Sequence, residues 1–368
     1  MAVKCGDIIK FMEEYAPPKL AEDWDNVGLM IGNRNDEIKK IMVCLDVTPE
    51  VIQAAEANNV NMIVSHHPFI FKGLKRINTD DLKGRMIIDL IRKGINVYSA
   101  HTNLDVTNGG VNEQLARTLG LKNLQILKSY KSERLFKLAV FVPKDSVDAV
   151  REALGKAGAG WIGNYSDCTF STEGIGTFRP LEGTNPYIGT KGNLEKVEEF
   201  RIETVVSESI LDKVVSSMIS VHPYEEVAYD IYPLELSGKE YGFGFVGETD
   251  EVVGVNEFAE TVKSRLDVQK VRVIGDIDKK VKRVAVFCGS FSNEIMGAVK
   301  SKADVLITGD VKYHDALDMM QMGMCVIDAG HFNTEKVVLP ALAGILKEKF
   351  KDLEVLCNNV EKDPFKYI

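Results

Sequence analysis

The sequence predicts an α/β protein in which duplicated βαβ units form the core and a smaller α+β domain is inserted between the two copies. Its 368 residues are about twice the length of an ordinary single domain. A pattern of apolar runs and helices near the start also returns near the end, which indicates an internal repeat. The composition, with 45% hydrophobic and 27% charged residues, argues against disordered, collagen-like and disulfide-scaffold classes.

The first copy has three apolar runs that we expect to be strands, namely Lys39–Asp46, Asn61–Ser65 and Ile95–Ala100. A helical pattern from Thr48 to Ala57 separates the first two runs. Continuous runs rich in β-branched residues that alternate with helices are typical of parallel strands buried on both faces. The first copy therefore reads as a βαβαβ unit.

The second copy repeats this order in Lys282–Gly289, Asp304–Thr308 and Met324–Ala329, with a helix expected from Asn293 to Val299. Ligands bind outside the carboxyl ends of the strands in open α/β sheets. We therefore expect the strand ends of both copies to lie at one edge of one sheet.

The segment between the copies has a different pattern, in which two strand-helix stretches flank a glycine-rich hairpin. This is the split β-α-β order of ferredoxin-like domains. We place the core at residues 1–126 and 237–368 and the insert at 127–236. The elements expected in the insert are strands at Arg134–Val142, Lys196–Ser207 and Val227–Tyr232, helices at Asp145–Ala157 and Glu208–Ser220, and a mobile hairpin or lid within Gly158–Gly192.

The charge and the cysteines limit the partners and the compartment. The net charge of −9 and the pI near 5.4 would repel nucleic acid, so an anionic ligand needs a local positive feature such as a metal ion. The six cysteines lack a C-x-x-C pair and read as reduced core residues. The chain opens with an amphipathic helix instead of a long apolar segment, so we expect a cytoplasmic protein with no membrane partner.

Histidines and carboxylates follow the predicted strands at equivalent places. The third strand of each copy is followed by H-x-N-x-[DE], in His101–Asp105 and in His331–Glu335, and the vicinal pair His66 and His67 follows the second strand of the first copy. Side chains at i and i+4 share one face of a helical turn and can reach one ion. Adjacent residues of an extended chain point to opposite sides, which suits two ions better than one.

These six side chains, His66, His67, His101, Asp105, His331 and Glu335, predict a dinuclear metal centre. Four nitrogens and two carboxylates suit two divalent ions from among Zn, Fe, Mn, Co and Ni. A water between the ions would be the candidate nucleophile. Taken singly, an H-x-x-x-E pair could be a surface helical pair and the vicinal histidines could cap a strand, but their convergence favours the metal site.

Several motifs carry a resemblance to the Nif-three-like family, whose members are labelled GTP cyclohydrolase 1 type 2 homologues. The resemblance covers the whole chain, and G-T-F-R-P at Gly176–Pro180 and H-P-Y-E-E at His222–Glu226 are similar to the longer bacterial members. The core motifs are W-D-N-V-G-L at Trp24–Leu29, S-H-H-P at Ser65–Pro68, H-T-N-L-D at His101–Asp105, T-G-D-x-x-x-H at Thr308–His314 and G-H-x-x-x-E at Gly330–Glu335.

The resemblance implies that the six residues above bind two metal ions, with Glu335 as the bridge. It also implies a toroidal homohexamer whose sites face an internal cavity, and a central domain similar to the PII and CutA-like trimeric fold. The label of GTP cyclohydrolase comes with the resemblance alone.

Other polar residues have a functional and a structural interpretation. Asp310 and His314 are candidates to orient the ligands or move protons, or are simply hydrogen-bonded loop residues. Asp25 and Asn26 could approach the same edge, while Trp24 beside them reads as core. Arg179 could contact an anionic ligand or lie in solvent, and His222 reads as part of a strand-entry turn.

Two functions follow from these residues. The first is a metal-dependent hydrolase that acts on a small anionic ligand such as a nucleotide or phosphoester. The alternative is a metal-binding regulatory or metal-handling protein in which the insert senses a small molecule. Opening of a purine ring by a GTP cyclohydrolase is a third option that the ligand set permits without specifying.

Overall fold

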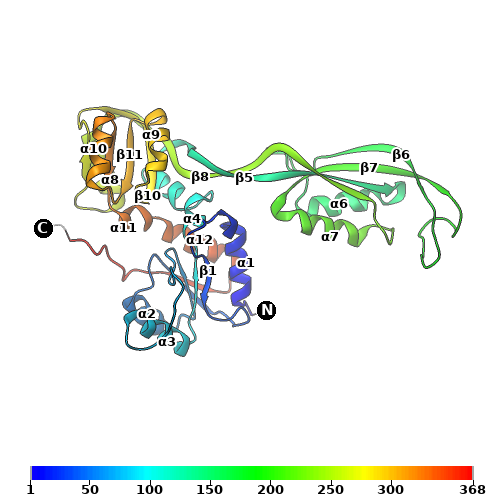
Figure 1. Ribbon diagram of the computed structural model, residues 1–368, viewed down its shortest axis with the longest axis horizontal. Helices are drawn as coiled ribbons and strands as arrows, with labels where there is room; N and C mark the ends of the chain where they lie inside the picture. The colour runs from blue at the N-terminus through cyan, green and yellow to red at the C-terminus, as the bar shows by residue number, and fades with distance from the viewer. Residues whose placement is uncertain (1, 367–368) are drawn as a thin grey trace. The chain divides into compact units, whose positions relative to one another are not determined.

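The computed structural model describes residues 2–366 as a mixed α/β protein with two sheets. The chain divides into two compact units, one made of Met1–Tyr130 with Tyr241–Ile368 and the other of Lys131–Glu240 (Figure 1). The sequence placed the ends of the insert at residues 127 and 236. Within the described residues, no helix is long and apolar enough to cross a membrane.

The first copy of the repeat forms a five-stranded sheet in the order β1-β4-β3-β2-β13. The strands β13, β2, β3 and β4 are parallel, and β1 pairs with β4 in the antiparallel direction. Every residue of β3 and β4 is buried, as the continuous apolar runs predict. The strands are β1 Gly28–Ile31, β2 Lys40–Cys44, β3 Met62–Ser65, β4 Asn96–Ser99 and β13 Glu354–Cys357.

Local signals set the helices of this half. The Oγ1 of Thr48 accepts a hydrogen bond from Val51 N at 3.3 Å and caps α2, and Asp81 caps α3 in the same way through Gly84 N at 2.7 Å. Gly94 ends α3 with a φ of 63°. The helices are α1 Cys5–Tyr15, α2 Pro49–Ala57, α3 Leu82–Lys93, α4 Thr102–Val106 and α5 Val111–Thr118, with a 3-10 turn at Pro18–Leu20.

The second copy contributes the parallel strands β10, β11 and β12 to the other sheet. The strand β8 pairs with β10 and β9 pairs with β12, both in the antiparallel direction. The strands are β8 Tyr229–Gly254, β9 Arg272–Ile274, β10 Lys280–Ser290, β11 Val305–Gly309 and β12 Cys325–Asp328. The helices are α8 Val255–Leu266, α9 Met296–Lys302, α10 Tyr313–Gln321, α11 His331–Glu335 and α12 Val338–Lys349, with a 3-10 turn at Asn293–Ile295.

The expectation that both copies share one sheet is wrong, because each copy lies in its own sheet. The edge of β2 that could have received the second copy is occupied by β13, and the corresponding edge of β10 is occupied by β8. The two copies join instead through a hydrophobic cluster that contains Val64 and Tyr98 from the first sheet and Val286 and Ile307 from the second. The strand ends of both sheets still meet at the site described below.

The inserted unit has its own hydrophobic cluster, in which α6 and α7 pack on its strands through residues such as Leu138, Val150 and Met218. Here β6 pairs with β7 and β7 with β5, all antiparallel. Its elements are the part of β5 (Lys122–Pro143) from Lys131 onward, α6 Val147–Ala157, β6 Thr169–Phe178, β7 Glu195–Ser207, α7 Leu211–Val221 and the start of β8, with 3-10 turns at Lys144–Ser146 and Glu208–Ile210.

The glycine-rich segment is more regular than the sequence predicts. Gly174 and Gly176 lie inside β6 and pair with Glu199 and Val197 of β7. An added Cβ at Gly176 would lie 2.0 Å from Glu199 Oε2, so close packing explains this glycine. Gly183, Gly189 and Gly192 lie in the connection between the two strands and have positive φ. The proposal of a lid can therefore apply to this connection and not to the whole segment.

Candidate metal centre

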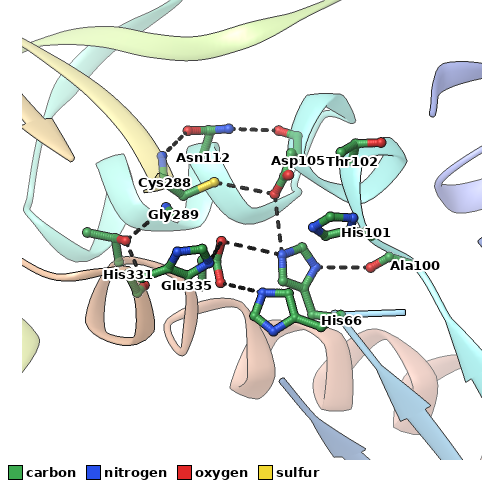
Figure 2. Close-up of polar contacts among 12 residues, drawn as sticks. His66, Ala100, His101, Thr102, Asp105, Asn112, Cys288, Gly289, His331 and Glu335 are labelled. Carbon is green, nitrogen blue, oxygen red and sulfur yellow. Dashed lines mark hydrogen bonds and ion pairs between the residues drawn. The ribbon is translucent and has the colours of Figure 1, made fainter. Parts of the chain in front are cut away.

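The structure brings the six predicted ligands together from three strand ends. Figure 2 labels His66, His101, Asp105, His331 and Glu335 among them. His66 and His67 follow β3. His101 follows β4 and directly precedes α4, which contains Asp105. The helix α11, which follows β12, begins with His331 and ends with Glu335. Glu335 lies at the centre, with Oε2 3.0 Å from His67 Nε2 and Oε1 3.1 Å from His331 Nε2. His66 Nε2 lies 3.6 Å from Asp105 Oδ1 and 3.8 Å from Glu335 Oε1.

The cluster contains two overlapping groups of potential ligands. His66, His67 and His101 form one group and His67, His331 and Glu335 the other, and within each group the ligand atoms lie within 4.8 Å of one another. The rings of His66 and His101 have centroids 5.3 Å apart, and those of His67 and His331 5.4 Å apart. Each group has the spacing and the donor atoms to hold a metal ion.

Each of the four imidazole rings is held in place through its own Nδ1 atom. The Nδ1 atoms of His67, His101 and His331 lie 3.0, 2.9 and 2.8 Å from carboxylate oxygens. The Nδ1 of His66 lies 3.0 Å from the carbonyl oxygen of Ala100. The carboxylates belong to Asp46, Asp25 and Asp310, in that order. This leaves every Nε2 free of these partners, as in metal sites where a carboxylate or carbonyl orients each histidine.

Unpaired polar atoms test whether a cation fits this cluster. His66 Nε2 and Glu335 Oε2 are buried and have no hydrogen bond of acceptable geometry, although His67 Nε2 lies 3.0 Å from the latter. Buried polar atoms without partners are costly, and a bound cation would satisfy a nitrogen lone pair and a carboxylate oxygen at once. The donor set therefore fits divalent metal ions.

Three glycines let the strand ends approach the cluster closely. Gly289, at the end of β10, has a φ of 64°, and an added Cβ would lie 2.3 Å from Glu335 Oε1. At Gly309 an added Cβ would lie 2.6 Å from the backbone nitrogen of His331. Gly330, which precedes α11, has a φ of 86°. Side chains at these positions would fill the space around Glu335 or strain the backbone.

The charges of the cluster shift the pKa values of its members. Burial lowers the pKa of His67, but the Asp46 and Glu335 carboxylates outweigh it and raise the pKa to about 10. The hydrogen bond to Glu335, opposed by burial, raises the pKa of His331 to about 9. Burial also opposes ionisation of Glu335, yet the three nearby imidazoles of His331, His66 and His67 hold its pKa well below the usual range. Without metal, protons on the histidines thus balance the central carboxylate.

Asp105 also contacts two residues, Asn112 and Cys288, that were not predicted from the sequence to belong to the site. Asn112 donates from Nδ2 to the carbonyl oxygen of Asp105 at 3.1 Å and accepts from Cys288 N at 2.8 Å. The thiol of Cys288 lies 3.3 Å from Asp105 Oδ1. Asn112 lies in α5 of the first half and Cys288 in β10 of the second, so this network joins the two halves beside the ligands.

The remaining site predictions have mixed outcomes. Asp310 contacts His331, whereas none of the polar contacts of the described residues joins His314 to the cluster, and its exposed ring packs on Tyr313. Asp25 reaches the cluster through His101. The prediction of a core position for Trp24 is wrong, because its side chain is 59% exposed and packs on Phe71 and His101.

Two predicted residues of the insert have local partners. Arg179 donates a hydrogen bond from Nη1 to the carbonyl oxygen of Gly192, within the glycine-rich connection. His222 Nε2 lies 3.0 Å from Phe141 O, and its Nδ1 accepts from Tyr224 N at 3.1 Å, which is the turn that the sequence favours.

Asp46, which contacts the ring of His67, is a residue of the cluster that was not predicted from the sequence. It directly follows β2, so its position at a parallel strand end was the available signal. The patterns that mark this site are strand-end histidines and carboxylates paired with a histidine, and an isolated aspartate carries neither pattern.

A cavity of about 910 Å³ adjoins the His67 and His331 side of the cluster. Its wall contains the chain end, with Lys362, Asp363, Phe365 and Lys366. A volume of this size is in the range of small-molecule sites.

Comparison with known proteins identifies the family. Residues 3–364 match Duf34/NIF3 (NGG1p interacting factor 3). The chain belongs to the Duf34/NIF3 family. Two relatives are named GTP cyclohydrolase 1 type 2 homolog. The one from Halalkalibacterium halodurans is 46% identical over 98% of this chain and 98% of its own length. The one from Bacillus subtilis is 45% identical over 100% of this chain and 99% of its own length.

Two solved structures share the fold. The crystal structure of a Bacillus cereus protein related to NIF3 is 43% identical, covers 100% of both chains and has a TM-score of 0.94. A Staphylococcus aureus protein, 33% identical over 100% of this chain and 99% of its own, has a TM-score of 0.77. The family resemblance drawn from the motifs is therefore confirmed.

Proposed function

We propose that this NIF3-family protein is a dinuclear metal-dependent hydrolase that acts on a nucleotide or phosphoester. The observation that carries the proposal is the orientation of four histidines by their Nδ1 atoms, which leaves four Nε2 atoms beside Glu335 and Asp105. Two divalent ions bound here would lower the pKa of a shared water and offer positive charge to an anionic substrate.

The chain assigns distinct tasks to its own residues. His66, His101 and Asp105 would hold one ion, and His67 and His331 the other. Glu335 Oε1 lies 3.8 Å from His66 Nε2 of the first set, and Glu335 Oε2 lies 3.0 Å from His67 Nε2 of the second, so Glu335 is the shared carboxylate of the proposal. Asp25, Asp46 and Asp310 hold the rings in place and keep the proton on Nδ1, so that Nε2 stays available as a ligand.

The cavity beside the cluster supports an anionic substrate. Three of its carboxylates already have donors, since Asp46 and Asp310 hold histidines and Asp328 contacts Arg272. Lys362 and Lys366 line the same cavity and have no ion-pair partner among residues 2–366. These two lysines offer cationic hydrogen-bond donors to the cavity, which favours a phosphate-bearing ligand.

The insert is proposed to have the ferredoxin-like fold of PII and CutA-like proteins. The strand order β6-β7-β5-β8, with α6 and α7 as the connecting helices, supports this proposal. The homohexamer implied by the resemblance and a cytoplasmic location stay predictions. Light scattering of the purified protein would test the first, and cell fractionation the second.

The alternative is a metal-binding regulatory or metal-handling protein. It is favoured by the insert, which forms a separate compact unit and supplies none of the six cluster residues. A hydrolase needs only the core, so a second unit of this size suggests that a small molecule is sensed. Binding of a ligand without turnover would favour this alternative.

Metal analysis followed by a substrate screen tests the proposal. The native chain, His67→Ala and the control His314→Ala would be purified without chelators, and their metal content would be measured. We expect about two ions per chain in the native and control proteins. We also expect metal-dependent hydrolysis of a nucleoside triphosphate or of bis(p-nitrophenyl) phosphate, with both properties reduced in His67→Ala. Two ions without turnover would favour the regulatory alternative, and no metal would overturn the site.

A further inference from the structure

The C-terminal segment that follows β13 runs beside the metal cluster. β13 is parallel to β2 and pairs Cys357 with Val43, so residues after β13 emerge at the same sheet edge as Leu45 and Asp46 after β2. The backbone N–H of Asn358 continues the ladder by donating to Val43 O at 2.9 Å. The end of the chain therefore arrives where Asp46 holds His67.

Glu361 binds the backbone of this strand end with both carboxylate oxygens. Its Oε2 accepts from Leu45 N at 3.0 Å and its Oε1 accepts from Asp46 N at 2.6 Å. Asn358 Nδ2 also donates to Glu361 Oε2. Two successive backbone donors thus meet one half-buried carboxylate across 316 positions of sequence.

The segment also contacts the other half of the cluster. Asp363 Oδ2 accepts from Asn333 Nδ2 at 3.1 Å, and Asn333 lies in α11 between His331 and Glu335. The chain end therefore joins the β2 end, which carries Asp46, to the helix that carries the central carboxylate.

We propose that Glu361 is a positioning residue of the metal centre, which fixes the Leu45–Asp46 backbone so that Asp46 keeps His67 aimed at Glu335. The inference rests on the proposed function, because it concerns the affinity of the same centre for metal. The relay has three steps, from Glu361 to Asp46 N, from Asp46 Oδ1 to His67 Nδ1 at 3.0 Å, and from His67 Nε2 to Glu335 Oε2 at 3.0 Å. The group of His67, His331 and Glu335 depends on this relay. His66, His101 and Asp105 are held by Ala100, Asp25 and the Asn112 network instead.

Metal affinity in Glu361 variants tests this dependence. Glu361→Ala and Glu361→Gln would be compared with Glu354→Ala, which removes an exposed carboxylate of β13 that pairs with Lys40 at 2.8 Å. We expect Glu361→Ala to bind one of two Mn²⁺ or Zn²⁺ ions about tenfold more weakly in competition with a chelator, and the other ion unchanged. Glu361→Gln keeps one acceptor oxygen and should be intermediate, and Glu354→Ala should match the native protein.

Amide hydrogen exchange of the metal-free protein gives a second, independent readout. We expect Leu45 and Asp46 to be protected in the native protein and to exchange faster in both Glu361 variants. Three results would overturn this inference and leave the proposed function standing. The first is an unchanged affinity of the Glu361 variants for both ions, and the second is an equal loss of affinity for both ions together with a lower melting temperature. The third is fast exchange of the Leu45 and Asp46 amides in the native protein. A native protein that takes up no metal would overturn the proposed function and this inference together. If Glu361→Ala does not fold, Glu361→Gln carries the same comparison.

Discussion

Asp25 and His101 form the best-satisfied carboxylate-histidine pair of the site. Asp25 Oδ1 lies 2.9 Å from His101 Nδ1, while its Oδ2 accepts from the backbone N of Thr102 at 3.0 Å and from the Thr102 hydroxyl at 2.6 Å. Burial works against ionisation, yet these hydrogen bonds lower the pKa of Asp25 to about 2. Asp25 is therefore ionised at neutral pH and holds the ring of His101, a candidate ligand.

Asp25→Asn should weaken metal binding by about 10- to 100-fold, because the amide keeps the shape but can no longer act as an anionic partner of His101. Asp23→Asn is the matched control, since Asp23 is an exposed neighbour. Metal affinity is measured by chelator competition. Equal affinities in the two variants would show that Asp25 is not needed to orient His101.

Metal affinity should rise with pH, since protons compete with metal for the histidines. The pKa values of about 10 for His67 and about 9 for His331 mean that both hold protons at pH 7 without metal. For each proton that the metal displaces, the apparent metal affinity should increase by up to about tenfold per pH unit, as long as the pH is below these pKa values. Titration calorimetry at pH 7 in buffers of different ionisation enthalpy should show proton release on binding, and less of it in His67→Ala. Binding without proton release would contradict the charge balance around Glu335.

The same pKa values predict that the stability of the metal-free protein falls as the pH rises, whereas its metal affinity increases. Both lie above the value of about 6.5 for an unfolded histidine, so the two ion pairs stabilise the fold fully below about pH 6.5. This contribution is lost as the pH rises through 9 and 10. The increase in melting temperature on adding metal should therefore be larger at pH 8.5 than at pH 6.5.

The clustering of the six candidate ligands could be predicted from the sequence because each one follows a strand in a short pattern. His66 and His67 directly follow β3, and His331 and Glu335 share a helical turn. The assignment to one sheet could not be predicted correctly, because β13 occupies the edge of β2 and comes from the far end of the chain. Strand pairing over such separations leaves no local periodicity.

The outer contacts of the site were missed for a similar reason. Glu361 accepts hydrogen bonds from backbone N–H groups. Because any nearby carboxylate can do this, no residue pattern in the sequence marks Glu361. Cys288 lies in an apolar run and reads as core, and its thiol meets Asp105 only because two sheets pack together. Such contacts depend on tertiary packing and not on spacing along one element.

Asn112→Ala should destabilise the protein by about 1–3 kcal/mol, because it leaves a buried N–H of Cys288 and a carbonyl of Asp105 without a partner. Urea unfolding of the metal-free protein measures this. The exposed Asn35→Ala is the control and should change the free energy of unfolding by less than about 0.5 kcal/mol. Equal stabilities would mean that water replaces the Asn112 side chain.

Gly289→Ala should remove metal from the centre through steric pressure on Glu335. Gly289 has a φ of 64°, and the added Cβ would lie 2.3 Å from Glu335 Oε1 and 3.3 Å from His331 Nε2. The shared carboxylate must move, so metal affinity should fall at least about tenfold, and the strained backbone should cost about 1–3 kcal/mol.

The control for this substitution is Gly344→Ala in α12, where an added Cβ meets no atom within 4 Å. Alanine is favoured over glycine inside a helix by about 1 kcal/mol, so this variant should be as stable as the native protein or more stable, with unchanged metal content. Metal content by mass spectrometry and the melting temperature separate the two effects. If Gly289→Ala retains the full metal content, Glu335 is free to shift without losing the ions, and its role as the shared carboxylate would have to be abandoned.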